Sequence, residues 1–165
     1  MFRGPELLTV THDCAGFDCG SEPLNHYLKR YALSNNAAGS ARTYVVSEGE
    51  NWRVIAYYSL CAASIEKTKA PERIGKGMPS HPIPVILLAR LAVDQERQGK
   101  GLGAGLLKDA MRRCLNAADS IGIRAVLVHA KDSKAAEFYA HFGFAPSPTD
   151  ALHLMLLIKD IKCAL

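Results

Sequence analysis

The spacing of apolar residues predicts a strand and then a helix in the first third of the chain. Weak alternation over Glu6–Thr11 is typical of a short strand. Ser21 is placed to cap a helix that has Pro23 in its first turn. Apolar residues then recur at helical spacing at Leu24, Tyr27, Leu28, Tyr31 and Ala32.

Two apolar stretches and a long polar segment follow this helix. Arg42–Val46 and Val54–Ala63 are joined by a short polar turn and predict a hairpin. Glu66–Pro84 is rich in Lys, Gly and Pro and predicts a loop, because prolines exclude a helix from its later part. These prolines are Pro79, Pro82 and Pro84.

The hydrophobic centre of the chain is a strand, a glycine turn and a helix. Val85–Val93 is almost continuously apolar apart from Arg90, as expected of a strand covered on both faces. Gln98–Gly105 is a turn, and apolar residues at helical spacing begin at Leu102. The positive side chains of this helix lie mostly on its other face: Lys108, Arg112 and Arg113.

The last third of the chain predicts a strand, a helix and a strand. Arg124–Ala130 is apolar enough for a buried strand. Asp132 or Ser133 can cap a short helix that stops at Gly143, and Leu152–Ile158 closes the sheet. This order of elements predicts an α/β (α+β mixed) protein with a mixed central sheet and helices on its faces.

Length and composition fit a globular protein. The 165 residues fit a single domain over 1–165, and the 48% hydrophobic and 22% charged residues are typical of a packed core. The longest apolar runs, Val85–Ala89 and Leu154–Ile158, are far shorter than the roughly 20 residues that span a bilayer. Glu6 stands where a signal peptide would have its apolar stretch. We therefore expect a cytoplasmic protein.

Five cysteines and six histidines are dispersed along the chain. Disulfide scaffolds and zinc sites have paired cysteines at short spacings. We therefore expect free thiols and no metal site. The cysteines are Cys14, Cys19, Cys61, Cys114 and Cys163.

The net charge of +4 is concentrated in the middle of the chain. Residues 29–113 hold 14 Lys and Arg against 7 Asp and Glu, whereas residues 1–28 sum to −3 and residues 114–165 to zero. Such a bias indicates a polyanionic partner, either a nucleic acid or the phosphates of a cofactor. Charge alone leaves open the alternative of a solvated basic face without a partner.

The glycine turn has the properties of an anion site. Gln98–Ala104 follows a buried strand and opens a helix, where free backbone N–H groups and the positive end of the helix dipole converge. Glycines there allow close approach and positive φ angles. Ala104 breaks the dinucleotide fingerprint that Gly99 would begin, and the Gly-Lys-Ser/Thr of a P-loop is absent. A purely structural glycine turn is the alternative.

This turn, Gln98-Gly99-Lys100-Gly101-Leu102-Gly103, resembles the pyrophosphate-binding signature of the GNAT acetyltransferase superfamily: Gln or Arg, two residues, Gly, one residue, Gly or Ala. In that family the preceding strand is split by a bulge, and its backbone holds the pantetheine arm and the acetyl carbonyl. The resemblance implies acetyl-CoA as cosubstrate. It implies cofactor contacts at Leu91, Ala92, Val93, Gln98, Gly99, Lys100, Gly101, Leu102, Gly103 and Ala104.

A second stretch, Ala135–Tyr139 followed by Gly143-Phe144, is similar to another signature of the family, in which a tyrosine faces the sulfur of coenzyme A. Acyl transfer from a thioester expels a thiolate, and a phenol with a pKa near about 10 can protonate it. Tyr139 is therefore the candidate catalytic acid, with aromatic packing as the alternative. Its neighbour Phe138 is assigned to the core.

The attacking group is a neutral amine. In an amino-acid ester the amine has a pKa below the roughly 7.7–8.0 of a free α-amino group, so no strong base is required. The backbone N–H of Val93 is a candidate to hold the oxyanion. We assign a solvated or structural role to the four side chains that could serve as a base: Asp94, Glu96, His129 and Glu137.

Segments along nearly the whole chain resemble the TacT-like GNAT toxins of bacterial toxin-antitoxin pairs. They are Phe17–Gly20, Arg42–Val45, Tyr57–Leu60, Pro82–Val85, Leu87–Asp94, Leu127–Ala130 and Phe144–Pro148. The resemblance implies a GNAT fold of six to seven strands and about four helices. It also implies acetylation of the α-amine of aminoacyl-tRNA, inhibition of translation, a ribbon-helix-helix antitoxin and a homodimer. Ala89 departs from the Gly of close relatives.

Basic residues in the segments that would flank the acetyl site fit a tRNA substrate, whereas a polyamine substrate would require acidic residues there. The candidate tRNA-binding residues are Lys29, Arg30, Arg42, Lys67, Lys69, Arg73, Lys76 and Arg90. Lys67, Lys69 and Arg73 have no packing role that the sequence reveals, whereas Arg90 lies in the cofactor strand and could form an ion pair. The alternatives are a GNAT enzyme for a small amine or a protein N-terminus, and a CoA-binding or DNA-binding partner without catalysis.

Overall fold

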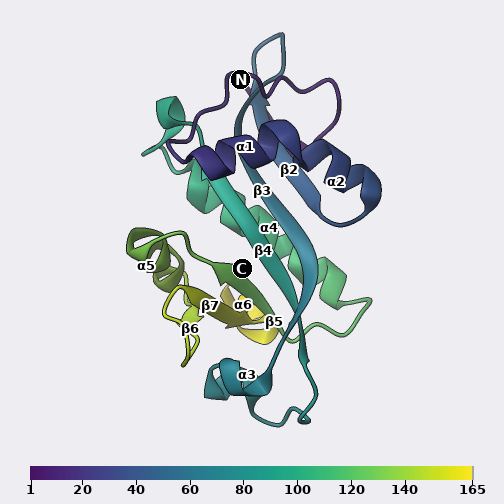
Figure 1. Cartoon of the computed structure of the whole chain (residues 1–165), viewed down its shortest axis with the longest axis vertical. Coiled ribbons are helices and arrows are strands. Elements are labelled where there is room, and N and C mark those ends of the chain that lie inside the picture. Colours follow the sequence, from purple (N-terminus) through teal and green to yellow (C-terminus); the bar gives the residue numbers. More distant parts are fainter. Residues whose placement is uncertain (165) are drawn as a thin grey trace. The chain divides into compact units, whose positions relative to one another are not determined.

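A computed structural model describes residues 1–164, which form strands and helices in mixed order (Figure 1). The strands are β1 (Phe2–Leu7), β2 (Arg42–Glu48), β3 (Arg53–Ile65), β4 (Ile83–Val93), β5 (Ala125–His129), β6 (Ala145–Pro146) and β7 (His153–Leu157). The α-helices are α1 (Glu22–Arg30), α2 (Ala32–Ala38), α3 (Glu72–Gly75), α4 (Leu102–Ala118), α5 (Ser133–His141) and α6 (Ile158–Ala164). Two short 3₁₀ turns occupy Lys67–Lys69 and Gln95–Arg97.

The strands hydrogen-bond in the order β1-β2-β3-β4-β5-β7-β6. The β4–β5 pair is parallel, and the pairs β1–β2, β2–β3, β5–β7 and β6–β7 are antiparallel. The mixed sheet and its seven strands confirm the predicted fold class. The expected number of about four helices is too low, because residues 1–164 contain six.

The chain folds into two compact units. Unit 1 contains Met1–Cys61 and Ala89–Ala110, and unit 2 contains Ala62–Leu88 and Met111–Leu165. The assignment of residues 1–165 to a single domain stays a prediction. Within the described residues, no helix combines the length and the apolar character needed to cross a membrane.

Two neighbouring tyrosines show how helices cover both faces of β3 in unit 1. Successive side chains of a strand point to opposite faces of the sheet. The Tyr57 hydroxyl donates to the backbone oxygen of Leu24 in α1 at 2.7 Å, and the Tyr58 hydroxyl donates to the carboxylate of Asp109 in α4. The helices α1 and α4 therefore pack on opposite faces of β3 (Figure 1).

The core of unit 1 lies beneath α1. Phe17 and Tyr57 are fully buried and meet edge to face, with ring centroids 5.6 Å apart. Tyr27 of α1 stacks on Tyr57 at 6.4 Å. Burial of such side chains contributes about 1.5–3 kcal/mol each to the free energy of folding. The buried apolar residues of α1 are among those that the helical spacing predicted.

The first strand lies earlier than predicted. It covers Phe2–Leu7, whereas the expected strand covered Glu6–Thr11. The backbone N–H of Thr9 donates to Nδ1 of His12, and His12 Nε2 in turn lies 3.0 Å from the Glu6 carboxylate. These local bonds compete with a strand ladder and turn the chain away after Leu7.

Unit 2 is built around the parallel pair β4–β5. The register runs from Val85 opposite Ala125 to Leu88 opposite Val128. Side chains of β4, β5 and β7 form its core together with Ile74 of α3. Arg124 ends α3 by donating to the backbone oxygens of Ile74, Lys76 and Arg73 at 2.9, 3.1 and 3.4 Å. These side-chain to backbone bonds support a helix of only four residues within the predicted loop Glu66–Pro84.

Candidate active site

A buried aspartate fixes the path of the chain between β4 and the glycine turn. Asp94 follows β4 directly and is 2% exposed. Its carboxylate accepts from the backbone N–H of Glu96 at 3.0 Å and of Asp18 at 3.1 Å. The Arg53 guanidinium lies 3.6 Å from it. Asp94 is therefore structural, as predicted, and is not positioned as a solvent-facing base.

The glycine turn adopts the predicted conformation at two of its three glycines. Gly99 and Gly101 have φ angles of 78° and 84°, in the left-handed region that favours glycine. Neither would meet another atom within 4 Å if it carried a Cβ, so conformation rather than space selects glycine there. Gly103 differs from the prediction, because it lies in the first turn of α4.

The start of α4 presents unused backbone donors. Its first intrahelical bond runs from the N–H of Gly105 to the oxygen of Gly101 at 3.1 Å, so the N–H groups of Leu102, Gly103 and Ala104 precede the helical ladder. The helix dipole adds a partial positive charge at the same place. This arrangement fits a pyrophosphate group.

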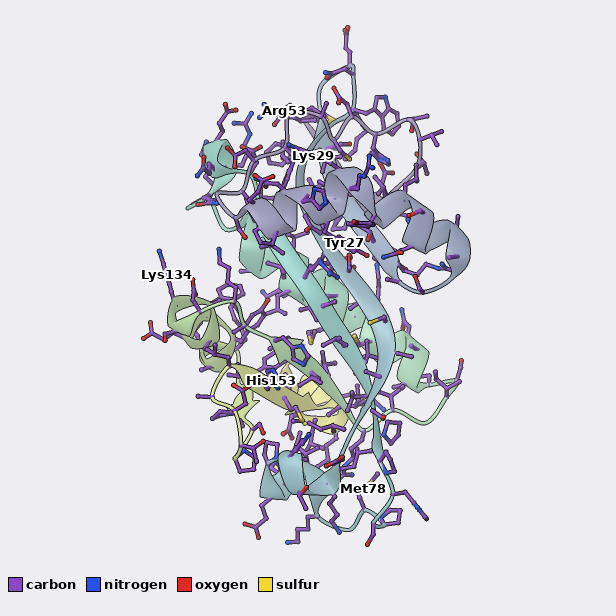
Figure 2. All side chains as sticks on the ribbon, in the orientation of Figure 1. Tyr27, Lys29, Arg53, Met78, Lys134 and His153 are labelled. Atoms are coloured by element: carbon purple, nitrogen blue, oxygen red, sulfur yellow. The ribbon has the colours of Figure 1, made fainter. Side chains whose placement is uncertain are left out.

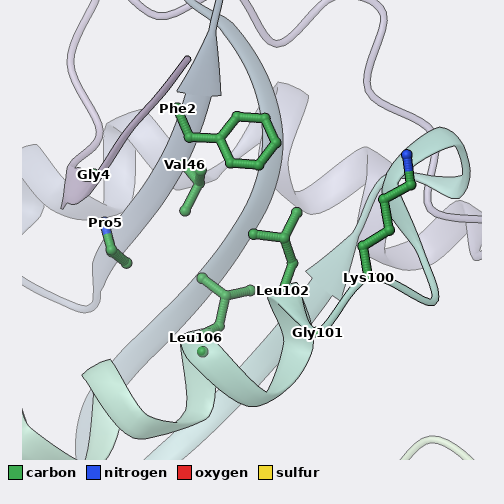
Figure 3. A pocket seen from close by; sticks show the side chains of 9 residues that line it. Phe2, Gly4, Pro5, Val46, Lys100, Gly101, Leu102 and Leu106 are labelled. Carbon is green, nitrogen blue, oxygen red and sulfur yellow. The ribbon is translucent and has the colours of Figure 1, made fainter.

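Apolar packing sets the direction of this helix start. Leu102 and Leu106 face Phe2 of β1 and Val46 of β2 across a cavity of about 270 Å³ (Figure 3). Lys100 extends from the loop beside it and is exposed. Leu106 is 1% exposed, so the backbone donors belong to a helix that a buried side chain anchors.

The Gln98 side chain ties the turn to its surroundings. Its amide Nε2 donates to the backbone oxygen of Val93 at 2.8 Å and of Cys19 at 3.1 Å. Gln98 therefore has a structural role, because its amide holds the loop against β4 and the segment before α1. Its contact with a cofactor stays a prediction.

Removal of the Gln98 amide is expected to loosen this loop. Gln98→Ala leaves two carbonyl groups without their donor, which lowers the free energy of unfolding by about 1–2 kcal/mol. Urea denaturation measures this change, and calorimetry with acetyl-CoA should show a matching loss of affinity. Lys100→Ala, in the same loop but without these bonds, is the control for stability; equal stability losses in both variants would contradict the role of the amide.

The cofactor strand presents two faces. Ala92 is buried in the core beneath α1 together with Tyr27 and Tyr57. Leu91 and Val93 are half-buried and, by strand alternation, point to the other face. The contacts of Leu91, Ala92 and Val93 with a cofactor, the oxyanion role of Val93 and the bulge in this strand stay predictions.

Tyr139 lies in α5, near the end of the helix. Asp132, one of the two predicted caps, begins this helix by accepting from the N–H of Ala135 at 2.8 Å. The tyrosine is 7% exposed, and its ring meets those of Phe138 and Phe144 edge to face at 5.2 and 5.7 Å. Among residues 1–164 its hydroxyl has no hydrogen-bond partner. Burial raises the pKa of Tyr139 to about 12, so the phenol stays protonated at neutral pH.

The other candidate acids and bases have structural surroundings. Glu96 pairs with Arg53 at 2.9 Å, and Glu137 is exposed on α5. His129 stacks on His153 with centroids 4.0 Å apart, and desolvation together with His153 lowers the pKa of His129. Phe138 is only half-buried and so is not a full core residue. The reaction without a dedicated base stays a prediction.

The described residues offer no metal centre. No cluster of three or more His, Cys, Asp or Glu side chains within them could hold a metal ion. All five cysteines are free thiols, as predicted. Burial raises the pKa of Cys114 to about 12 and that of Cys14 to about 11, so these thiols are poor nucleophiles.

The eight predicted tRNA-binding residues divide equally between the two units. Unit 1 holds Lys29, Arg30, Arg42 and Arg90, and unit 2 holds Lys67, Lys69, Arg73 and Lys76. All are exposed except Arg90, which is half-buried. Its guanidinium lies 3.6 Å from the centre of the Tyr27 ring, a cation–π contact in place of the ion pair considered from the sequence.

The loop cations are less free than the sequence suggested. Lys67 donates to the backbone oxygen of Met78 at 2.7 Å. Arg73 binds both carboxylate oxygens of Asp160, at 2.6 and 3.2 Å. Lys69 lies 4.0 Å from Glu66. Lys67 and Arg73 therefore have structural partners that the sequence does not reveal. These partners lie 11 and 87 positions away in the chain, so local spacing gives no sign of them.

Comparison with known proteins assigns the family. The profile of the acetyltransferase (GNAT) domain matches residues 39–146. A Mycobacterium tuberculosis protein called tRNA-acetylating toxin is 47% identical over 161 residues, which cover 98% of this chain and 95% of the relative. The chain belongs to the GNAT acetyltransferase family, and it is an N-acetyltransferase.

Two solved structures extend this likeness to the whole fold. AtaT complexed with acetyl-methionyl-tRNAfMet is 31% identical, with a TM-score of 0.90 over 99% of this chain and 98% of that one. A mutant of the AtaT toxin bound to the C-terminus of the antitoxin AtaR and to acetyl-CoA is 29% identical. Its TM-score is 0.83, over 99% of this chain and 96% of that one.

Proposed function

We propose that this enzyme transfers an acetyl group from acetyl-CoA to the α-amino group of aminoacyl-tRNA, and that it inhibits translation as the toxin of a toxin-antitoxin pair. The observation that carries the proposal is the 47% identity, over nearly the full length of both chains, to a tRNA-acetylating toxin. The site and the charges of this chain support it independently.

Acetyl-CoA fits the turn between β4 and α4. The N–H groups at the start of α4 and the left-handed glycines before it provide donors for its pyrophosphate. Bound there, acetyl-CoA supplies an activated acetyl thioester. The residues assigned to hold it are Leu91, Ala92, Val93, Gln98, Gly99, Lys100, Gly101, Leu102, Gly103 and Ala104.

Tyr139 is assigned as the acid. A phenol with its pKa raised to about 12 keeps its proton and donates a hydrogen bond to the sulfur as charge develops there. The attacking amine loses one proton and the leaving thiol gains one, so the overall reaction takes up none from solution. Because the amine of an aminoacyl ester is partly neutral near pH 7, the chemistry needs no dedicated base.

The exposed cations fit a polyanionic substrate. Lys29 and Arg30 lie at the end of α1, and neither forms an ion pair or hydrogen bond with a side chain of the described residues. Arg42 starts β2, and its guanidinium is held by the backbone oxygen of Asn36 at 2.6 Å. Unpaired cations of this kind bind phosphates and release counterions. A ribbon-helix-helix antitoxin, a homodimer and a cytoplasmic location complete the proposal.

Charge reversal at the end of α1 tests the substrate class. In Lys29→Glu/Arg30→Glu the KM for charged tRNA should rise several-fold, and the slope of log affinity against log salt should become shallower by about 2. The KM for acetyl-CoA should not change. The matched control is Lys108→Glu/Arg112→Glu on α4, whose N-terminal half lies on the opposite face of β3 from α1.

The same assay separates tRNA from smaller acceptors. A small amine or a protein N-terminus gives little salt dependence, since few counterions are released. Equal effects of both double variants, or acetylation of a free amino acid as fast as of charged tRNA, would contradict the proposal.

A further inference from the structure

An exposed aromatic side chain lies at the junction of α1 and α2. Tyr31 is 49% exposed. Its ring contacts His26 edge to face, with centroids 5.4 Å apart, and its hydroxyl forms no hydrogen bond with residues 1–164. A single exposed apolar ring is common on protein surfaces, so its surroundings decide its meaning.

Those surroundings are positively charged. Lys29 and Arg30 directly precede Tyr31, are exposed and have no acidic partner within ion-pair distance among the described residues. Arg42 is held beside α2 by the oxygen of Asn36. An exposed aromatic ring directly after two unpaired cations fits the binding of single-stranded nucleic acid, in which bases stack on aromatic rings and phosphates meet cations.

Packing connects this surface to the cofactor strand. Tyr27 lies one helical turn before Tyr31, stacks on Tyr57 of β3 and carries the Arg90 guanidinium 3.6 Å above its ring. Arg90 is the neighbour of Leu91 in β4. Tyr27 is buried, whereas Lys29 two residues later is exposed; both are labelled on α1 in Figure 2. The end of α1 is therefore fixed to the strand at which the acceptor amine must arrive.

The part of a charged tRNA that must reach the cofactor strand is its aminoacylated 3′ end. The amino acid is attached to the 3′ end, whose last nucleotides are unpaired and free to stack on an aromatic side chain, whereas bases within the duplex stem are stacked on one another. We propose that Tyr31, supported by His26, is a stacking platform for an unpaired nucleotide at the 3′ end of the tRNA, with Lys29 and Arg30 on its phosphates. This proposal rests on the proposed function.

The test compares Tyr31→Ala with Tyr31→Trp. Binding of deacylated tRNA, followed by fluorescence anisotropy at fixed salt, should weaken by roughly 5–150-fold in Tyr31→Ala and recover in Tyr31→Trp. Because stacking releases few counterions, the salt slope should stay that of the wild type, unlike that of Lys29→Ala. Leu33→Ala, an exposed apolar residue on α2, is the matched control and should bind normally.

A tRNA trimmed of its unpaired 3′ nucleotides identifies the stacking partner. Wild type and Tyr31→Ala should bind the trimmed tRNA equally. Circular dichroism confirms that each variant is folded. If Tyr31→Ala binds intact tRNA as tightly as the wild type, or loses as much affinity for trimmed tRNA, the platform is wrong while the proposed function stands. If the wild type acetylates no charged tRNA, the proposed function fails instead.

Discussion

Tyr139→Phe should lower the rate of acetyl transfer by roughly 10²–10⁴-fold, as expected when a general acid is lost. The substitution removes the hydroxyl and keeps the ring, so the edge contacts with Phe138 and Phe144 remain. Affinity for acetyl-CoA and thermal stability should therefore be unchanged, and growth inhibition on expression should disappear. Single-turnover transfer, calorimetry and a melting curve measure the three quantities.

The pH profile is a second readout of the same residue. Since burial raises the pKa of Tyr139 to about 12, the phenol is protonated below that pH, and no alkaline loss of activity should arise from its ionisation between pH 7 and about 10. Phe138→Leu is the control, because this half-buried neighbour shares the aromatic cluster without a hydroxyl. Transfer by Tyr139→Phe at the wild-type rate would show that Tyr139 only packs.

Gly101→Asp should reduce affinity for acetyl-CoA by at least roughly 100-fold, because a carboxylate at the start of α4 repels the pyrophosphate and competes for the same N–H groups. A Cβ at Gly101 meets no atom within 4 Å, and Asp tolerates the left-handed conformation better than most residues, so the fold should persist. Calorimetry on the folded variant measures the loss.

Gly101→Asn separates charge from backbone strain. It has the shape and the left-handed tolerance of Asp but no charge, so its affinity should fall far less. Equal losses in the Asp and Asn variants would mean that strain at φ 84° and not repulsion is responsible. Undiminished affinity for acetyl-CoA in Gly101→Asp would show that the pyrophosphate does not bind at this turn.

The sequence predicts those elements of the fold that have strong local patterns of apolar residues and glycines. The apolar strand, glycine turn and helix around Gln98–Gly105 were predicted to within a few residues, and α4 begins at Leu102 as expected. The short helices were missed because distant contacts support them. Asn36 helps to hold α2 by bonding Thr43 and Leu8, and Arg124 ends α3. Neither partner can be inferred from local spacing.

In the candidate site, too, features set by neighbouring residues are predictable, whereas contacts between distant residues are not. The left-handed glycines and the position of Tyr139 on a capped helix follow from local sequence. The pairing of Arg73 with Asp160, the placement of Arg90 over Tyr27 and the two bonds of Gln98 depend on residues brought together only by folding. A sequence gives the type of these side chains but not their partners.

The most direct measurement of the central claim is the fate of a labelled acetyl group. The protein is incubated with labelled acetyl-CoA and a mixture of charged tRNAs, the RNA is digested, and the labelled product is identified by mass spectrometry. Our account predicts that the label is on the α-amino group of an aminoacyl-adenosine, that Tyr139→Phe forms almost none, and that deacylated tRNA receives none. Label on a base, on a protein or on free amines in preference to the aminoacyl group would contradict it.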